Sequence, residues 1–575
     1  MKPIFTFFTL FLFSYSLFSQ SQTQWGEETK SDGFYTKKCV LKNGSGGAYF
    51  LKGNLFLSEF SFLYSDGKDV KVVKKFNYKN QKDFRLRGAE VLDDKLIICY
   101  SKADKENTKV FLQVLNSDLE EEELIEAINI DIKSTFFNNL SIDLISNPSK
   151  KNIAIVWNKD ILKAKKINNG FVLYNESLEK INEFSKDLDY DPDLFSVTNY
   201  FLLNNGNVLS AITEYDSSFK KENAKNLLMP VTLSSNERKI ENLYLYLFKE
   251  EDKQLIKLEL PEKQIFDFNL IEDKNNSICV LGSYYSSNIN LGKLMGREQK
   301  NDVEGLFYFK IDLDDFVVTS QKKKEFEVEM IVKNLTPQER LSVLKKYNKN
   351  NHIPNMKAFV LNDVYALNDG SILGTLEQRI NVNNEPYGNQ NSSINSHHYN
   401  STNVTNQNTV AAGYTTTSST FRSLNSSQQP TFLFEDILAF KINEEGNFEW
   451  ITRIQKKQIS QYESGIYSSY LSFVENDKFR IVFNDTDKNY KDDDSFDNDK
   501  RISTLQWGKW VVAEVELDIN EGSMSRKVLI DSESMPDKSF SIKESYYDDE
   551  NKFLHFLILK SKIGSQSIRL GKMKL

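Results

Sequence analysis

Residues Leu367–Gly374 read LNDGSILG, a polar turn followed by an apolar strand that ends in glycine. Asn, Asp and Gly tolerate the unusual backbone angles that a tight turn requires. The apolar run after the turn is typical of a strand that is buried on both faces. The stretch therefore predicts a β-hairpin inside a packed, all-β core.

The same succession of apolar strand, polar turn and apolar strand recurs at seven places. These seven stretches begin at Ala89, Ile142, Tyr200, Phe268, Val364, Tyr470 and Glu544. A second hairpin pattern, alternating apolar and polar residues, follows six of them and is typical of outer strands with one face in solvent. Two hairpins make a four-stranded unit, and about seven such units in a row predict a single β-propeller.

The fifth unit also carries a family resemblance. LNDGSILG, followed by DILAFKINEEGNFEW from Asp436, resembles the repeats of secreted bacterial β-propeller proteins. The other units share the pattern of these repeats more than their letters. The resemblance implies the propeller fold and export from the cytoplasm, and it implies no particular chemistry.

Closure of the ring is expected to involve the N-terminus. The last unit shows only three clear strands, the final one in SIRLGKMKL, so we expect a strand from Ala48–Tyr78 to complete it. Because that segment contains two strands, eight blades are a second interpretation. An open stack of sheets, or two smaller β domains, is a third.

The first residues predict an exported protein. Lys2 precedes an almost unbroken apolar run from Ile4 to Phe18, and small polar residues follow from Ser19. This is the composition of a secretory signal peptide, which we assign to residues 1–19 with cleavage after Ser19 or Ser21; an uncleaved anchor is the alternative. No later stretch has the length of a membrane span, so we expect an extracytoplasmic protein, periplasmic or secreted, without a span after cleavage.

The rest of the chain divides into a flexible segment, residues 20–47, and the propeller, residues 48–575. The composition is that of a globular protein, with 39% hydrophobic and 27% charged residues. The net charge is −8 and no dense Lys/Arg block occurs, which disfavours a nucleic-acid partner. Three cysteines are too few for a disulfide framework, and Cys99 and Cys279 are expected to be small buried residues.

Long insertions are expected on one face of the ring, because they fall between the second and third strands of four successive units. The longest, residues 381–430, is rich in Asn, Ser, Thr, Gln and Gly and cannot bury a core. A capping box, Thr336 to Glu339 with Pro337 between them, predicts one short inserted helix. Binding sites usually develop on loops held by a rigid scaffold. The alternative is that the insertions have no function, because added loop length costs little free energy.

Two sets of side chains are candidates for binding. Asp187, Asp189, Asp191 and Asp193 alternate, so their oxygens would suit calcium; a solvated acidic loop is the alternative. Trp507 and Trp510 flank the insertion of the sixth unit and would stack on a sugar ring, or else pack in the core. No cofactor other than this calcium is expected.

No nucleophile elbow, Cys–His pair, phosphate loop or HExxH motif is present. The sequence therefore favours a binding or scaffold module for a protein or glycan, acting through the insertion-bearing face. The alternative is a propeller-fold, polysaccharide-active enzyme with a carboxylate pair in the central pocket. A structural part of an envelope assembly is the third hypothesis, and whether the chain is an enzyme is left open.

Overall fold

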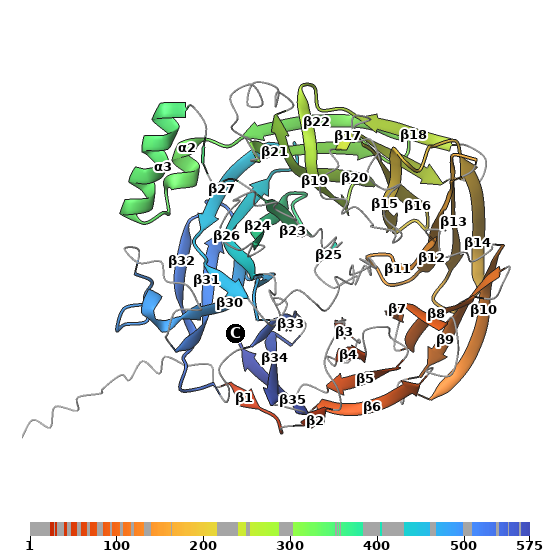
Figure 1. Ribbon diagram of the computed structural model, residues 1–575, viewed down its shortest axis with the longest axis horizontal. Helices are drawn as coiled ribbons and strands as arrows, with labels where there is room; N and C mark the ends of the chain where they lie inside the picture. The colour runs from red at the N-terminus through yellow and green to blue at the C-terminus, as the bar shows by residue number, and fades with distance from the viewer. Residues whose placement is uncertain are drawn as a thin grey trace, which may run out of the picture.

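A computed structural model of the chain shows strands arranged around a ring (Figure 1). It describes residues 23–575 except for residues 28, 32–39, 43–47, 54–58, 66–69, 78–83, 93–94, 104–106, 117–119, 132–139, 163, 216–239, 249–252, 287–302, 351–352, 355, 357, 383–402, 405–430, 461–466, 498–508, 536–539, 550 and 563–564. The predicted signal peptide, residues 1–19, lies outside the described residues. So do Trp507 and most of the insertion at 381–430.

The described strands form seven sheets, antiparallel except for the pairing of β23 with β25, so the all-β propeller prediction is confirmed. Four sheets have four strands each. They comprise β3 (Val40–Lys42), β4 (Ala48–Gly53), β5 (Glu59–Ser65) and β6 (Val70–Asn77); β7 (Phe84–Leu92), β8 (Lys95–Ala103), β9 (Asn107–Leu115) and β10 (Glu121–Asp131); β11 (Leu140–Ser146), β12 (Ile153–Ile161), β13 (Lys166–Tyr174) and β14 (Lys180–Leu188); and β29 (Leu471–Glu475), β30 (Lys478–Thr486), β31 (Trp510–Asp518) and β32 (Met524–Ile530).

The other three sheets are larger, with five, six and eight strands. They comprise β33 (Ser541–Asp548), β34 (Phe553–Lys562), β35 (Ser565–Lys574), β1 (Gln24–Trp25) and β2 (Thr29–Ser31); β23 (Phe359–Ala366), β24 (Ile372–Val382), β25 (Asn403–Val404), β26 (Thr431–Ile442), β27 (Phe448–Ile454) and β28 (Gln458–Ser460); and β15 (Phe195–Leu202), β16 (Val208–Tyr215), β17 (Ile240–Phe248), β18 (Lys253–Leu258), β19 (Lys263–Glu272), β20 (Ser277–Ser286), β21 (Gly305–Asp312) and β22 (Val317–Glu325).

The all-β propeller is present, but the prediction of about seven four-stranded blades is wrong in its count. Five sheets are separate blades of four or five strands, and the six-stranded sheet adds two short strands to β23, β24, β26 and β27. The eight-stranded sheet consists of two successive groups, β15–β18 and β19–β22, joined at the single pair Ile240–Ile265. The segment Ala48–Tyr78, whose strands were the basis for the eight-blade interpretation, supplies three strands of the separate sheet β3–β6.

Two corrections concern the N-terminal segment. A strand from this end does complete the last sheet, but β1 and β2 supply it by pairing with β35. The predicted donor, Ala48–Tyr78, instead supplies β4, β5 and β6 of a separate sheet. Residues 20–47, predicted to be flexible, thus include β1, β2 and β3. The sequence QWGEETKS has no alternation of apolar residues, so only the pairing partner shows that it forms strands.

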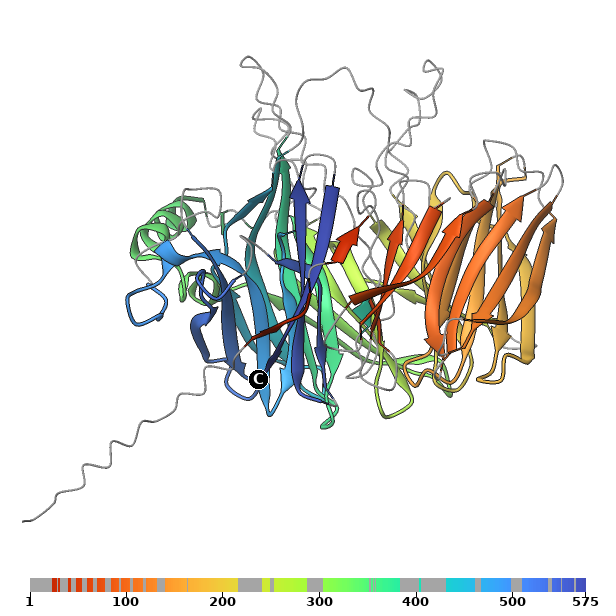
Figure 2. The same cartoon turned by 90° about the horizontal axis from the view of Figure 1, so that it is seen from below.

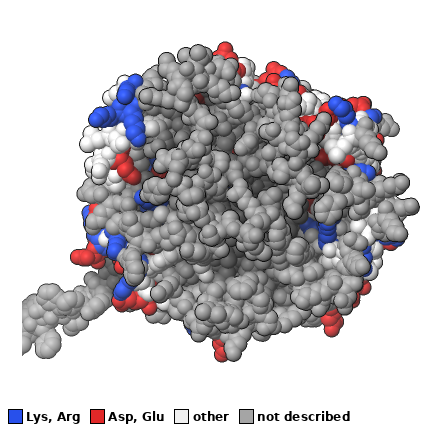
Figure 3. Space-filling view, viewed as in Figure 1, with Lys and Arg blue, Asp and Glu red and all other residues white. Residues whose placement is uncertain are grey.

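Two α-helices, α2 (Val328–Val332) and α3 (Pro337–Asn350), lie between β22 and β23. The predicted capping box is confirmed, because the Glu339 N–H donates to Thr336 Oγ1 at 3.3 Å and the Thr336 N–H donates to Glu339 Oε2 at 3.4 Å. The helices lie at the outer edge of the ring near β27, not on the face with the insertions (Figures 1 and 2). Lys and Arg side chains gather over this edge (Figure 3). Among the described residues, no helix combines the length and the hydropathy needed to cross a membrane.

The glycine that ends LNDGSILG makes room for an aromatic ring. A Cβ on Gly374 would lie 2.2 Å from Phe440 Cζ on the neighbouring strand, and a Cβ on Gly282 would meet Phe307 at 2.7 Å. Both phenylalanines are fully buried. Cys99 and Cys279 are buried and free, on second strands of different blades, as predicted. The repeated phrase therefore supplies both the turn and a close-packed layer.

The strands run up and down between the two ends of the ring, so the ring has two distinct faces (Figure 2). We call the face where β16, β20, β24 and β30 end the insertion face, because the long insertions follow those strands. We call the opposite face the hairpin face. On it, residues of successive first hairpins contact one another: Lys150 Nζ with Glu90 Oε2 at 2.6 Å, Ser149 N with Asn204 Oδ1 at 3.1 Å, Asn204 N with Glu272 Oε2 at 2.9 Å, and Lys274 Nζ with Asn368 Oδ1 at 2.5 Å.

Glu272 makes this belt of contacts sensitive to pH. Burial raises the pKa of Glu272 to about 7, with Asp273 adding to the shift and the Asn204 N–H opposing it. A raised carboxyl pKa contributes stability that is present below about 4.5 and lost as pH rises through about 7. We expect Glu272→Gln to remove this loss, worth at most about 3 kcal/mol at 1.36 kcal/mol per pKa unit.

Urea unfolding of both proteins at pH 5 and pH 8 checks this expectation. Glu176→Gln, in an exposed turn, is the matched control. A Glu272→Gln variant with the same pH slope as the wild type would contradict the assignment.

Candidate functional site

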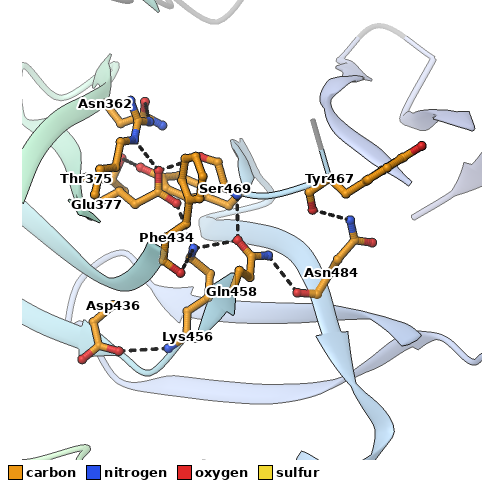
Figure 4. A network of polar contacts seen from close by, with 12 residues as sticks. Asn362, Thr375, Glu377, Phe434, Asp436, Lys456, Gln458, Tyr467, Ser469 and Asn484 are labelled. Carbon is orange, nitrogen blue, oxygen red and sulfur yellow. Dashed lines mark hydrogen bonds and ion pairs between the residues drawn. The ribbon is translucent and has the colours of Figure 1, made fainter. Parts of the chain in front are cut away.

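The most elaborate polar cluster of the described residues lies beneath the insertion face, between the β23–β28 sheet and the β29–β32 sheet (Figure 4). Its centre is Glu377, on β24 and 0% exposed. Glu377 Oε1 lies 2.9 Å from Lys456 Nζ, and Oε2 accepts hydrogen bonds from Arg379 Nε and Ser469 Oγ, both at 2.7 Å. One carboxylate thus holds three donors that come from three separate segments.

The charge of Glu377 is fixed by these neighbours. Burial alone would raise its pKa, but Lys456 and Arg379 outweigh burial and lower the pKa to about 2. The same burial lowers the pKa of Lys456. Glu377 is therefore ionised across the physiological range, and it has no proton to give to a substrate.

The network continues across the β29–β32 sheet. Lys456 Nζ donates to Gln458 Oε1 at 2.9 Å, and Gln458 Nε2 donates to the Asn484 carbonyl at 2.8 Å. Asn484 Nδ2 then donates to the carbonyls of Tyr467 and Phe540, each at 2.8 Å. This chain of contacts fixes the strand ends that carry the insertion at 383–430 and reaches the start of the last sheet.

A second ion pair lies at the side of this network. Asp436 Oδ2 accepts from Arg453 at 2.6 Å, and Asp436 Oδ1 accepts the Lys456 N–H at 3.1 Å. Both side chains are buried. Buried charges of this kind are costly unless paired, so their full pairing indicates a rigid support rather than a reactive group.

Of the two predicted tryptophans, Trp510 can be placed. It begins β31 on the insertion face and packs edge-on against Tyr467, with ring centroids 6.5 Å apart. Both rings are only partly buried. The Tyr467 carbonyl accepts a hydrogen bond from Asn484 Nδ2, which connects the aromatic pair to the network.

The four predicted calcium ligands do not converge. Asp187 Oδ1 accepts from Asn168 at 2.8 Å, Asp189 pairs with Lys166 at 2.8 Å, and Asp191 pairs with Lys165 at 3.0 Å. The Asp193 N–H donates to Asp191 Oδ1 at 3.0 Å. In the part of the chain that the structure describes, no three His, Cys, Asp or Glu side chains form a metal-binding group. Calcium binding by this run stays a prediction.

A second acidic run, from Asp485 to Asp494, folds back on the outside of its own sheet. Asp485 Oδ2 accepts from the Tyr490 hydroxyl at 2.9 Å and pairs with Arg526. The Arg526 guanidinium lies 3.9 Å from the Phe496 ring centroid and 4.9 Å from that of Phe483. The Asp485 carboxylate is thus engaged by neighbours within the chain.

Buried carboxylates on the innermost strands join neighbouring sheets. Asp267 Oδ2 accepts the Leu361 N–H at 2.9 Å, and Asp363 Oδ2 accepts from Ser472 Oγ. The pairing of β23 with β24 is interrupted between Leu361 and Val364, which places Asp363 in a bulge. Bulges often redirect side chains near functional sites. Here the redirected carboxylate links two blades.

Sequence reasoning missed the residues of the network. Glu377, Lys456 and Ser469 are far apart in the chain, and no motif connects them. The one available signal was the TLEQR stretch, where charged residues continue a strand that begins with the apolar ILG. Charged residues in a central strand indicate buried pairing.

No protein-family model matches the chain, and no curated protein matches it. Among solved structures, 192 chains match. The β-propeller domain of the Trilobed protease from Pyrococcus furiosus shares 10% identity over 87% of this chain and 98% of that chain, with a TM-score of 0.30. A Synechocystis apocarotenoid oxygenase shares 9% identity over 89% and 95%, with a TM-score of 0.34.

Other matched structures are enzymes of different kinds. A polysaccharide lyase of family PL25, an ulvan lyase, shares 9% identity over 60% of this chain and 78% of that chain, with a TM-score of 0.33. The chain spans 38% to 55% of the length of the prolyl oligopeptidase B structures from Galerina marginata that it matches. At these identities and scores, the matches assign no activity to this chain.

Proposed function

We propose that this chain is an exported β-propeller that binds a protein or glycan partner through its insertion face. The observation that carries the proposal is the aromatic pair Tyr467–Trp510, which is partly exposed on that face and held from below by Asn484. Partly exposed aromatic rings on a rigid base are a common feature of protein and glycan recognition. The network under them lowers the entropic cost of binding, because the surrounding strand ends are already fixed.

The enzyme alternative receives less support from the described residues. Glu377 is 0% exposed and its pKa is lowered to about 2, and Asp267 and Asp363 accept hydrogen bonds from the adjacent blade. A glycosidase needs two carboxyl groups that can reach a substrate, one of them able to give a proton. These three carboxylates do not meet that requirement.

The proposal is tested by capturing partners from the extracytoplasmic fraction of the source cells and by glycan-array binding. We expect the double variant Tyr467→Ala/Trp510→Ala to lose at least tenfold in affinity for whatever the wild type captures. The matched control is Ile181→Ala, which removes an exposed apolar side chain from outer strand β14. Equal binding by all three proteins would exclude the aromatic pair as the contact, and equal binding by the loop-replacement variant as well would overturn the proposal.

A loop-replacement variant separates the aromatic pair from the insertion. Val382 and Thr431 pair directly, so residues 383–430 can be replaced by an Asn-Gly turn without moving β24 or β26. If binding survives this replacement but not loss of the two rings, the aromatic pair is the contact. If it is lost only on replacement, the insertion is the contact and the face remains the binding surface.

A further inference from the structure

A cleft, which we call the seam cleft, lies where the last sheet, including β1, meets the β29–β32 sheet. Its volume is about 510 Å³, which is in the range of small-ligand sites. Among its lining residues are Arg480, Glu516, Lys527, Phe553, Lys572 and Lys574. These residues lie near the strand ends of the hairpin face, so the cleft is separate from the insertion face.

On one wall of the cleft, the charged side chains form ion pairs with one another. Arg480 pairs with Glu475 at 2.9 Å, with Glu516 at 3.1 Å, and also with Glu514. Lys527 lies 3.2 Å from Glu514 and 3.5 Å from Glu516. Arg480 and Lys527 are thus both engaged by the three carboxylates of this wall, which exceed them by one negative charge.

The opposite wall carries positive charge that the described residues do not neutralise. Lys572 and Lys574 alternate on β35, so their side chains leave the same face of the strand. Lys572 Nζ lies 5.1 Å from the Phe553 ring centroid. No carboxylate of the described chain forms an ion pair with either lysine. The two ammonium groups therefore form the anion-attracting side of the cleft.

The other side chains of the cleft suit hydroxyl groups and an apolar ring face. Glu516, with 24% of its side chain exposed, can accept from a hydroxyl, and the Gln24 amide can both donate and accept. Phe553 and Leu529 supply apolar surface. We infer that the seam cleft binds an acidic saccharide of one or two units, with its carboxylate between Lys572 and Lys574 and its hydroxyls toward Glu516 and Gln24.

The test is calorimetric titration of the full chain with glucuronate as the probe, and with glucose and sodium sulfate at matched ionic strength. We expect saturable binding of glucuronate, at least tenfold weaker binding of glucose and sulfate, and at least tenfold weaker glucuronate binding by Lys572→Gln/Lys574→Gln. The matched control is Lys322→Gln/Lys323→Gln on outer strand β22, which removes the same charge away from the cleft. This control is expected to bind as the wild type does.

Three outcomes would overturn the inference: no saturable binding of glucuronate, equal binding of glucuronate by both double variants, or equal binding of sulfate and glucuronate. A circular-dichroism melt of each variant establishes that it is folded. If the double variant is not folded, the single variant Lys574→Gln, at an exposed position, replaces it in the titration. The partner-capture experiment on the insertion face does not depend on these lysines, so failure of one proposal is distinguishable from failure of the other.

Discussion

A chain that begins at residue 32 is expected to unfold at a much lower denaturant concentration than one that begins at Thr23. The shorter chain lacks β1 and β2, which pair with β35 and cover the last sheet. It loses the Gly26 N–H bond to the Leu570 carbonyl at 2.9 Å and the Arg569 Nε bond to the Gly26 carbonyl at 2.7 Å. It also exposes Phe540, which stacks on Trp25 at 5.8 Å.

Trp25 provides a sharper version of the same experiment. Its ring fits over Gly571, where an added Cβ would lie 2.2 Å from Trp25 Cζ3. We expect Trp25→Ala to cost about 3 kcal/mol, the low end for loss of a packed Trp, because the ring is only partly buried. Gly571→Ala is expected to be costly in the wild type and nearly neutral in Trp25→Ala. Additive costs in this double-mutant cycle, measured by urea unfolding, would show that the two residues do not pack together.

Replacing Glu377 with Met is expected to cost about 3–5 kcal/mol, because it leaves Lys456 and Arg379 buried without their anion. The double variant Glu377→Met/Lys456→Met is expected to be more stable than the single variant, since it removes most of the stranded charge. The lowered pKa of Glu377 contributes stability that is present above about 4.5 and lost as pH falls toward about 2. Acid unfolding of the wild type is therefore expected to show a loss of stability in this window that Glu377→Met lacks.

The exposed pair Lys180–Glu183 is the matched control for this network. Its side chains are 52% and 44% exposed and lie 2.7 Å apart. Replacing both residues with Met is expected to change the free energy of unfolding by less than about 1 kcal/mol. If Glu377→Met is no more costly than this surface pair, then the buried network does not hold the insertion face together.

The sequence was most informative where structure is local. The turn in LNDGSILG and its six counterparts predicted hairpins because Asn, Asp and Gly act within a few residues. The capping box at Thr336 and Glu339 was predictable for the same reason. Alternation of apolar and polar residues then identified the outer strands.

What the sequence did not reveal depends on pairing between distant residues. Nothing in QWGEETKS indicates a strand until β35 lies beside it. Glu377, Lys456 and Ser469 form a site only because two sheets meet there. The aspartates from Asp187 to Asp193 alternate as calcium ligands would, yet lysines at 165 and 166 pair with two of them. Such a cross-strand pair can be found only once the register of the strands is known.

The seam formed by β1 and β2 also bears on the order of folding events. Arg569 and Gly26, which contact each other there, are 543 residues apart in the chain. Bringing such distant segments together costs roughly 3–4 kcal/mol more than closing a loop of about ten residues, from the logarithmic scaling of loop entropy. The blades between them can form from local hairpins as the chain emerges, whereas the ring can close only after residues 565–574 have been delivered. β1 and β2 precede the other described strands in the chain but can pair only with the last one, β35. We therefore expect the pairing of β1 and β2 with β35 to be a late and slow step of folding.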